Sequence, residues 1–421
     1  MGDGVSRRRF LGGAAGVGAA AFGLSAPALA ASEPVKIGFV VPQTGSLAFF
    51  SEHVPFVLDQ VKKTFGNQAP TAAGKVPFEI IVKDSQSSAG RASEVAAELI
   101  LKDRVSVLLA TSTPETTNPV ADQAELNGVP CITTDTPWEP HFFGRHGDPK
   151  SGFQWTNHFF FGASQLTTTY LGLWGRFATN KRIGVLWPND GDGNAVSGLF
   201  PKAFEKAGFA VVDPGRFDLP VGSFAAQIAS FKSKDVDIVN GVLPPPEFAT
   251  FWAEAGQQGF KPKVVSVGKA TEFPSAIAPL GQRAVGLSVP VFWSPDFPYV
   301  SAMTGQSARE LAAEYETVSG RQWSMTLGFK HALFEVLFDV LRRAPDPRSP
   351  ERLRDTIRQT KYNAVTGPVD FQMPGLPPGI SKTPLAGGQW QKGGRYPLEL
   401  AIIDNADEPS IKTTAAPMTL G

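Results

Sequence analysis

The chain alternates regularly between short β-branched runs and longer stretches with helical character. Four such runs occur in the first part of the chain, at residues 35–41, 78–82, 105–109 and 129–133. They are nearly continuous in apolar residues, which is typical of parallel strands buried on both faces. The stretches between them predict helices over 50–64, 91–102 and 119–126. A parallel sheet covered by helices on both faces is therefore expected.

The same alternation starts again further along the chain. Residues 153–156 are expected to bridge to a second series of alternating helices and strands, with helices at 162–179, 195–207 and 223–233 and strands at 182–187, 209–213, 236–240 and 263–267. A third section adds a strand at 284–290, helices at 306–318, 325–343 and 350–360, strands at 366–371 and 398–403, and an irregular Pro/Gly-rich stretch at 373–394. The sequence therefore predicts an α/β fold with two doubly wound lobes.

The first thirty residues are expected to be a signal peptide rather than part of the fold. Ser6-Arg7-Arg8-Arg9-Phe10-Leu11 precedes a glycine- and alanine-rich apolar stretch, and Ala28-Leu29-Ala30 gives a small-x-small cleavage pattern. The arginines followed by Phe10-Leu11 resemble a twin-arginine signal, which implies export through that pathway. The apolar stretch is too short and too rich in glycine to be a good membrane span, so no membrane insertion is expected.

The composition excludes several classes of protein. The chain has 39 basic and 39 acidic residues and a formal net charge of zero, whereas a nucleic-acid-binding protein normally carries a basic excess. The single cysteine, Cys131, excludes an intrachain disulfide framework and a cysteine-rich metal site. Hydrophobic residues make up 42% of the chain, which is typical of a folded globular protein.

The motifs of cofactor, metal and catalytic sites are incomplete. Gly191-Asp192-Gly193 starts like a dinucleotide-binding loop, but Val196 occupies the place of the third glycine. The acids at 190 and 192 start like a calcium loop, but Pro201 stands where the bidentate acid belongs. The five histidines lack the spacing of a metal site, and the sequence contains no Gly-x-Ser-x-Gly elbow. The sequence therefore predicts no cofactor, no metal and no enzymatic activity.

The order of these segments resembles the type 1 periplasmic solute-binding proteins of branched-chain amino acid ABC importers. The resemblance rests on the segments 36–45, 84–86, 127–132, 181–186 and 203–208. It implies two lobes joined by three crossovers, with the ligand clamped between them. We place the crossovers near 156, 281 and 373. The expected division is thus a signal peptide at 1–30, a first lobe of 31–155 plus 282–372, and a second lobe of 156–281 plus 373–421.

The resemblance also implies a function and partners. It predicts a periplasmic monomer that binds a small-molecule ligand and delivers it to an ABC permease and ATPase complex. A ligand sensor with the same fold is an alternative, and a catalytic role is a third. Closure of a hinge around the ligand is the mechanism that the family implies.

Two hydroxyl-rich loops follow neighbouring strands and are candidates for binding a carboxylate. The first follows the strand at 105–109 and the second follows the strand at 129–133; their candidate residues are Thr111, Ser112 and Thr113, and Thr134, Asp135 and Thr136. Ligands in such sheets bind beyond the carboxyl ends of the strands, and in the resembled family these loops hold the ligand's carboxylate. Capping of the following helices is the alternative role for these side chains.

Aromatic residues gather at the corresponding strand ends and are candidates for the apolar part of a pocket. They are Phe49 and Phe50 after the first strand, Trp187 at the end of a second-lobe strand, and Phe292 with Trp293 after the strand at 284–290. Ordinary core packing is the alternative for any one of them.

The charge of the ligand is predicted from a departure from the family pattern. The acidic residue that would pair with a ligand ammonium falls by register on Ala270, although Glu272 or Asp135 could take its place. Lys269 offers a cation instead, unless it is a solvated surface lysine. We therefore expect an aromatic carboxylate, or another carboxylate without an α-amino group, with branched-chain or other amino acids and amides as the alternative.

Overall fold

Two seven-stranded sheets form the frame of the protein in the computed structural model, which describes Met1 and residues 33–420. The strand order is β14-β6-β5-β4-β1-β3-β2 in the first sheet and β16-β15-β11-β10-β9-β7-β8 in the second. Most neighbouring strands are parallel; among the described strands the antiparallel pairs in these sheets are β2–β3, β11–β15 and β15–β16. The predicted α/β fold of two lobes is confirmed. The expected signal peptide lies outside the described residues.

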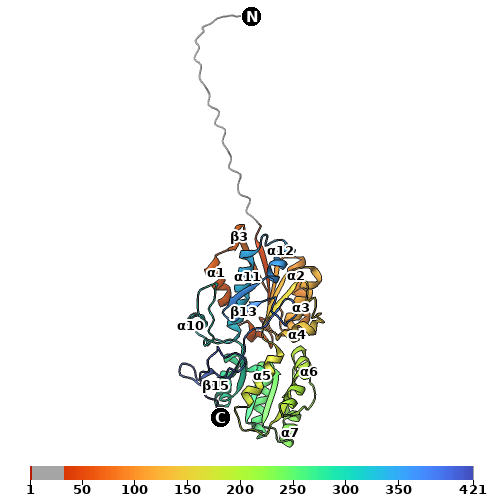
Figure 1. The fold of residues 1–421 in the computed structure, drawn as a ribbon, viewed down its shortest axis with the longest axis vertical. Helices are drawn as coiled ribbons and strands as arrows, with labels where there is room; N and C mark the ends of the chain where they lie inside the picture. Colours follow the sequence, from red (N-terminus) through yellow and green to blue (C-terminus); the bar gives the residue numbers. More distant parts are fainter. Residues whose placement is uncertain (2–32, 421) are drawn as a thin grey trace. The chain divides into compact units, whose positions relative to one another are not determined.

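The first lobe consists of the first sheet and the helices that cover it (Figure 1). Its elements are β1 (Val35–Val41), α1 (Val54–Phe65), β2 (Gln68–Thr71), β3 (Gly74–Asp84), α2 (Ala89–Leu101), β4 (Val107–Thr111), α3 (Pro114–Asn127), β5 (Cys131–Thr134), α4 (Trp138–Phe142), β6 (Thr156–Phe159), α10 (Ala308–Ser319), α11 (Thr326–Arg343), α12 (Pro350–Arg358), the hairpin of β12 (Lys361–Ala364) and β13 (Gly367–Asp370), and β14 (Ile380–Ser381).

The second lobe consists of the second sheet and its helices. Its elements are α5 (Ala163–Trp174), β7 (Arg182–Leu186), α6 (Gly191–Lys206), β8 (Ala210–Val212), α7 (Ala225–Ser233), β9 (Ile238–Leu243), α8 (Pro245–Gln257), β10 (Val264–Lys269), α9 (Pro274–Ile277), β11 (Ser288–Val291), β15 (Ala386–Lys392) and β16 (Leu398–Asp404). Among the described helices, none combines the length and apolar character needed to cross a membrane.

The central strands are buried on both faces, as their continuous apolar sequences require. In β1 every residue except Lys36 is buried. Helices α2 and α3 pack together against one face of this sheet, while α11 and α1 pack on the other (Figure 1). Gly38 allows this packing, because a Cβ there would lie 2.8 Å from a methyl group of Leu108. The two faces of the sheet are thereby both sealed from water.

The chain passes between the lobes later than expected at each of its three crossovers. Strand β6 pairs with β5, so the first crossover follows Phe159 rather than residue 155. Strand β11 pairs with β10 in the second sheet, so the second crossover follows Val291 rather than residue 281. Strand β14 pairs with β6, so the third follows Ser381 rather than residue 372. The hydrogen-bonded pairing of these short strands sets the boundaries, and apolar patterning does not reveal it.

The parallel topology brings the functional loops together. Strands β4, β5 and β6 run in the same direction in the first sheet, and β7, β9 and β10 do so in the second. Their carboxyl ends, with the loops and helix N-termini that follow, border a common cavity between the two sheets. This is where ligands bind in open α/β sheets.

Candidate functional site

A cavity of about 480 Å³, counting the part open to solvent, lies between the carboxyl ends of the two sheets. The first sheet contributes residues that follow β1, β4, β5 and β6, and the second contributes residues at the ends of β9, β10 and β11. Both lobes therefore enclose the same space, as a ligand clamp requires.

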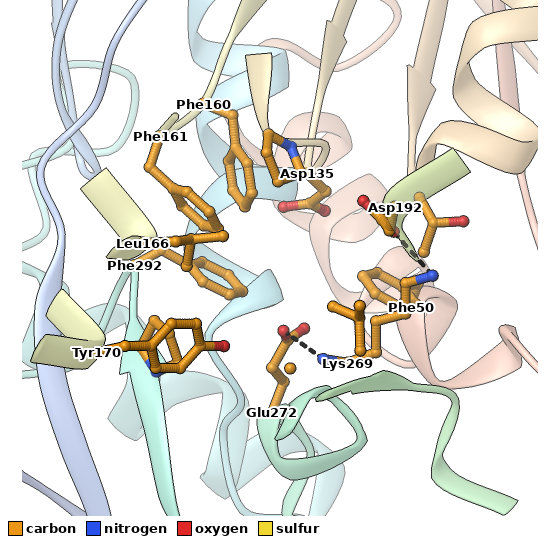
Figure 2. Close-up of a pocket in the computed structure, with 15 residues that line it drawn as sticks. Phe50, Asp135, Phe160, Phe161, Leu166, Tyr170, Asp192, Lys269, Glu272 and Phe292 are labelled. Atoms are coloured by element: carbon orange, nitrogen blue, oxygen red, sulfur yellow. Dashed lines mark hydrogen bonds and ion pairs between the residues drawn. The ribbon is translucent and has the colours of Figure 1, made fainter. Parts of the chain in front are cut away.

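One side of the cavity is aromatic. Figure 2 shows Phe160, Phe161, Leu166, Phe292 and Tyr170 gathered on this side. The ring centroids of Phe160 and Phe161 are 4.1 Å apart, and that of Phe292 is 5.1 Å from Phe160. Phe160 and Phe161 follow β6 directly, while Leu166 and Tyr170 are one turn apart on α5. This wall suits the flat or branched apolar body of a small solute.

Asp135 lines the cavity and forms a buried ion pair. Lys330, on α11, places its Nζ 2.7 Å from Oδ2 of Asp135, and both side chains are fully buried. The hydroxyl of Thr111 donates to the same oxygen at 2.5 Å. Burial lowers the pKa of Lys330, although attraction to Asp135 works in the other direction. Oδ1 of Asp135 has no hydrogen-bond partner, and Asp135 lines the cavity, so this carboxylate can still accept a bond from a ligand.

Lys269 stands in a cluster of acids rather than as a free cation. Its Nζ lies 2.8 Å from Asp192, 3.2 Å from Asp190 and 3.7 Å from Glu115. Burial works against its charge, but attraction to these three carboxylates holds the pKa of Lys269 well above its usual value. The expectation that Lys269 pairs with a ligand carboxylate is therefore not supported by its geometry, because its charge is already compensated.

Two carboxyl groups at the cavity titrate near neutral pH. Burial raises the pKa of Glu272 to about 7, and a backbone N–H donated by Lys269 at 2.8 Å only partly offsets this. Burial also raises the pKa of Asp192 to about 7, in spite of its attraction to Lys269. Such groups donate a hydrogen bond when protonated and accept one when ionised. The site can therefore bind either an anionic group of a ligand, when these carboxyl groups are protonated, or a hydrogen-bond donor, when they are ionised.

The hydroxyl loops lie where the sequence predicts, but most of their hydroxyls serve the protein itself. Thr134 donates to the carbonyl of Phe159 at 2.7 Å, and Thr136 donates to the carbonyl of Ser112 at 2.8 Å. Thr113 lines the cavity, and the buried hydroxyl of Ser112 has no hydrogen-bond partner. The loops thus tie β4, β5 and β6 together and leave few polar groups for a ligand.

The structure brings together five of the twelve predicted ligand-binding residues and places the other seven elsewhere. Those that line the cavity are Phe50, Thr113, Asp135, Lys269 and Phe292. Those that do not are Phe49, Thr111, Ser112, Thr134, Thr136, Trp187 and Trp293. The two tryptophans are core residues, because their buried indoles donate to Asn240 and to the carbonyl of Val365. Phe49 instead packs against Phe273, with ring centroids 5.7 Å apart.

Several cavity residues were not predicted from the sequence. Phe160 and Phe161 were missed because the first crossover was placed before β6, although their position directly after a strand is a usable signal. Lys330, the partner of the cavity residue Asp135, was missed because it lies in the middle of a long helix, far along the chain from Asp135. No group of three or more histidine, cysteine or acidic side chains among the described residues has the geometry to hold a metal ion.

Comparison with known proteins identifies the family. Residues 34–395 match the model of a periplasmic binding protein. The chain belongs to the periplasmic binding protein family. The predicted resemblance is thereby confirmed, and the cavity between the lobes of this periplasmic binding protein is its candidate solute site.

Solved structures of similar fold include binding proteins for different solutes. A leucine-binding protein, LivK, from Thermotoga maritima has a TM-score of 0.71 and 20% identity, with 89% of this chain and 99% of that one covered. An ABC-transporter solute-binding protein from Rhodopseudomonas palustris in complex with 3,4-dihydroxybenzoic acid has a TM-score of 0.68 and 19% identity, with the same coverage. A further solute-binding protein from R. palustris, in complex with 4-hydroxybenzoate, has a TM-score of 0.70 and 16% identity over 89% of this chain and 99% of that one.

Proposed function

We propose that this protein is the substrate-binding component of an ABC importer and that its solute is a small aromatic carboxylate. The observation that carries the proposal is the cavity between the lobes, with an aromatic wall on one side and ionisable carboxyl groups on the other. The predicted periplasmic location, the twin-arginine export route and the ABC permease and ATPase as partners are parts of this proposal.

The aromatic body of the solute would lie against Phe160, Phe161 and Phe292. Offset or edge-to-face contacts between aromatic rings contribute about 0.5–1.5 kcal/mol each beyond the burial of their area. The carboxylate would face Thr113, which lines the cavity as the N-cap residue of α3 and whose hydroxyl has no hydrogen-bond partner. Two structurally similar proteins were solved with hydroxylated benzoates, which supports a solute of this class.

A hydrogen-bond donor at the other end of the solute would face Glu272. This residue lines the cavity and accepts a single backbone N–H, so its carboxyl group has capacity for a further bond. A phenolic hydroxyl provides such a donor, and so does an ammonium. The absence of an acid at position 270 therefore does not exclude an amine, because Glu272 and Asp135 both reach the cavity.

Amino-acid binding is the second candidate function, and Glu272 is the observation that favours it. A desolvated ammonium needs an anionic partner, which Glu272 can supply when it is ionised. The similarity to a leucine-binding protein supports the same alternative.

A solute screen separates the two candidates. Thermal unfolding of the purified protein would be followed with benzoate, 4-hydroxybenzoate, 3,4-dihydroxybenzoate, leucine, isoleucine and phenylalanine, and calorimetry would then give affinities. A solute that binds the native state raises the apparent melting temperature. We expect the hydroxybenzoates to raise it and leucine to leave it unchanged. Tight leucine binding with no response to any benzoate would replace this proposal by the amino-acid alternative.

A further inference from the structure

The acids around Lys269 come from both lobes. Asp190 is the N-cap of α6, Asp192 lies in the first turn of that helix, and Lys269 is the last residue of β10, so all three belong to the second lobe. Glu115 lies in the first turn of α3, in the first lobe. The cluster therefore joins the two lobes, beside the cavity that Figure 2 shows.

Glu115 is held by two contacts that cross from one lobe to the other. Its Oε1 accepts a hydrogen bond from the backbone N–H of Gly191 at 2.7 Å, and its Oε2 lies 3.7 Å from Nζ of Lys269. The approach is close, since a Cβ on Gly191 would lie 2.9 Å from Oε1 of Glu115 and 3.0 Å from Cβ of Pro114. Both contacts exist only while the lobes are together.

Lys269 is the counter-ion that makes this approach favourable. Without it, Glu115 would face Asp190 and Asp192 across the opening, and three carboxylates would repel one another. Burial alone would raise the pKa of Glu115, but attraction to Lys269, with help from the Gly191 N–H, brings it below its usual value. The side chain of Lys269 is only 6% exposed, so solvent screens this attraction weakly.

The backbone at Lys269 fixes the direction of its side chain. Its φ of 62° is positive, a conformation that residues other than glycine seldom adopt. The backbone N–H of Lys269 donates to Glu272 at 2.8 Å, which holds this conformation in place. Strain of this kind persists where the surrounding structure over-determines it, and it is common at functional sites.

We propose that Lys269 and Glu115, with Asp190 and Asp192, form a clasp that holds the lobes closed. Lys269 is thus a positioning residue: it raises solute affinity by stabilising the closed arrangement and makes no bond to the solute. The clasp depends on one part of the proposed function, namely that the two lobes open and close around the cavity.

The test measures the separation of the lobes without any solute. Cysteines would be introduced at the exposed positions Lys102 and Lys202, one in each lobe, and carry spin labels for double electron–electron resonance. The native Cys131 is buried and its pKa is raised to about 12 by burial, so it should not compete for the label. The variants are Glu115→Gln and Lys269→Met in this labelled background.

The matched control is Asp122→Asn. Asp122 lies on the same helix as Glu115 and pairs with Arg145 at 2.6 Å, but both partners belong to the first lobe. Its loss should leave the lobe separation unchanged. Melting curves of every variant would establish that each is folded, and Glu115→Gln still allows the test if Lys269→Met does not fold.

We expect Glu115→Gln and Lys269→Met to shift the distance distribution toward longer separations, with the closed-to-open ratio reduced about tenfold, the change that loss of one charge-assisted hydrogen bond produces. Distributions that superimpose on the parent protein would overturn the clasp. So would a Lys269→Met variant that loses solute binding without any change in distance, because Lys269 would then contact the solute. A failure of every benzoate to bind would overturn the proposed solute and leave these distances to decide the clasp.

Discussion

Replacing Lys330 with methionine should lower the free energy of unfolding by about 3–5 kcal/mol, because it leaves a buried charge without a partner. The Nζ of Lys330 is 2.7 Å from Asp135, and neither side chain is exposed to solvent. At this distance, and with an effective dielectric constant of about 20, the attraction is roughly 6 kcal/mol. Removing both ions from water costs several kcal/mol each, so the intact pair itself contributes little.

The loss of one partner is more costly than the loss of both. In Lys330→Met, Asp135 would keep only the hydroxyl of Thr111 on Oδ2 and still have no partner on Oδ1. The double variant Lys330→Met/Asp135→Asn removes the charge as well, and asparagine tolerates the positive φ of 64° at position 135. Its stability should return to within about 1–2 kcal/mol of the parent protein.

Urea unfolding of the four proteins of this double-mutant cycle provides the measurement. Losses that add up in the double variant would show that packing around the lysine stem, and not the charge, is responsible.

Three further predictions follow from single groups. Burial raises the pKa of Glu335 to about 7. Ionisation of Glu335 therefore destabilises the folded protein progressively above pH 4.5, and the Glu335→Gln variant avoids this loss, so the difference in unfolding free energy between variant and parent should grow by roughly 3 kcal/mol in favour of the variant from pH 4 to pH 8. Equal pH profiles of the two proteins would contradict this. Gly328→Ala should cost about 1–3 kcal/mol in urea unfolding, because its Cβ would overlap the buried ring of Trp293, and an unchanged midpoint would contradict it. Calorimetry with 4-hydroxybenzoate should show affinity rising as pH rises from 6 to 8, since Glu272, with a pKa raised to about 7 by burial, becomes an anion that accepts the phenolic hydrogen bond more strongly, and Glu272→Gln should flatten this profile; an affinity that falls as pH rises would contradict a phenolic hydroxyl at Glu272.

The fold could be predicted wherever strands are long and apolar. The run at 35–41 is β1 without change, and the long helix expected at 325–343 is α11. Strand β6 was not predicted because Asn157 and His158 are polar, but both side chains find partners elsewhere in the chain. His158 bonds to the carbonyl of Thr136 at 2.7 Å and to the hydroxyl of Thr133, and Oδ1 of Asn157 accepts a hydrogen bond from Arg358 at 3.1 Å. A local pattern does not reveal a polar strand whose partners lie elsewhere in the chain.

Strand β15 and helix α8 were not predicted because they contain glycine and proline. Strand β15 contains Gly387 and Gly388, which are poor strand formers; a Cβ on Gly388 would lie 2.3 Å from the side chain of Val291, so the close approach of β11 requires glycine there. Helix α8 begins at Pro245 and was not predicted, although proline is well suited to a first helical turn. In β15, tertiary packing, which no local pattern encodes, decides the structure.

The candidate site was predicted at the level of loops and less well at the level of side chains. Parallel topology alone indicates which strand ends meet, and Thr113, Asp135 and Phe292 lie at the cavity accordingly. Sequence could not show that the charge of Lys269 is shared among three carboxylates, because all three lie far from it along the chain. The pairing of buried charges depends on distances that only the folded structure provides.

The three crossovers also set the order in which this protein can be made. The first sheet receives its last strand, β14, from residues 380–381, and the second receives β15 and β16 from residues 386–404. Neither lobe can therefore be completed during synthesis until nearly the whole chain has left the ribosome. Contacts between residues so distant in sequence slow folding. A fragment that ended before β15 would leave β11 with an unpaired edge, open to aggregation with other chains.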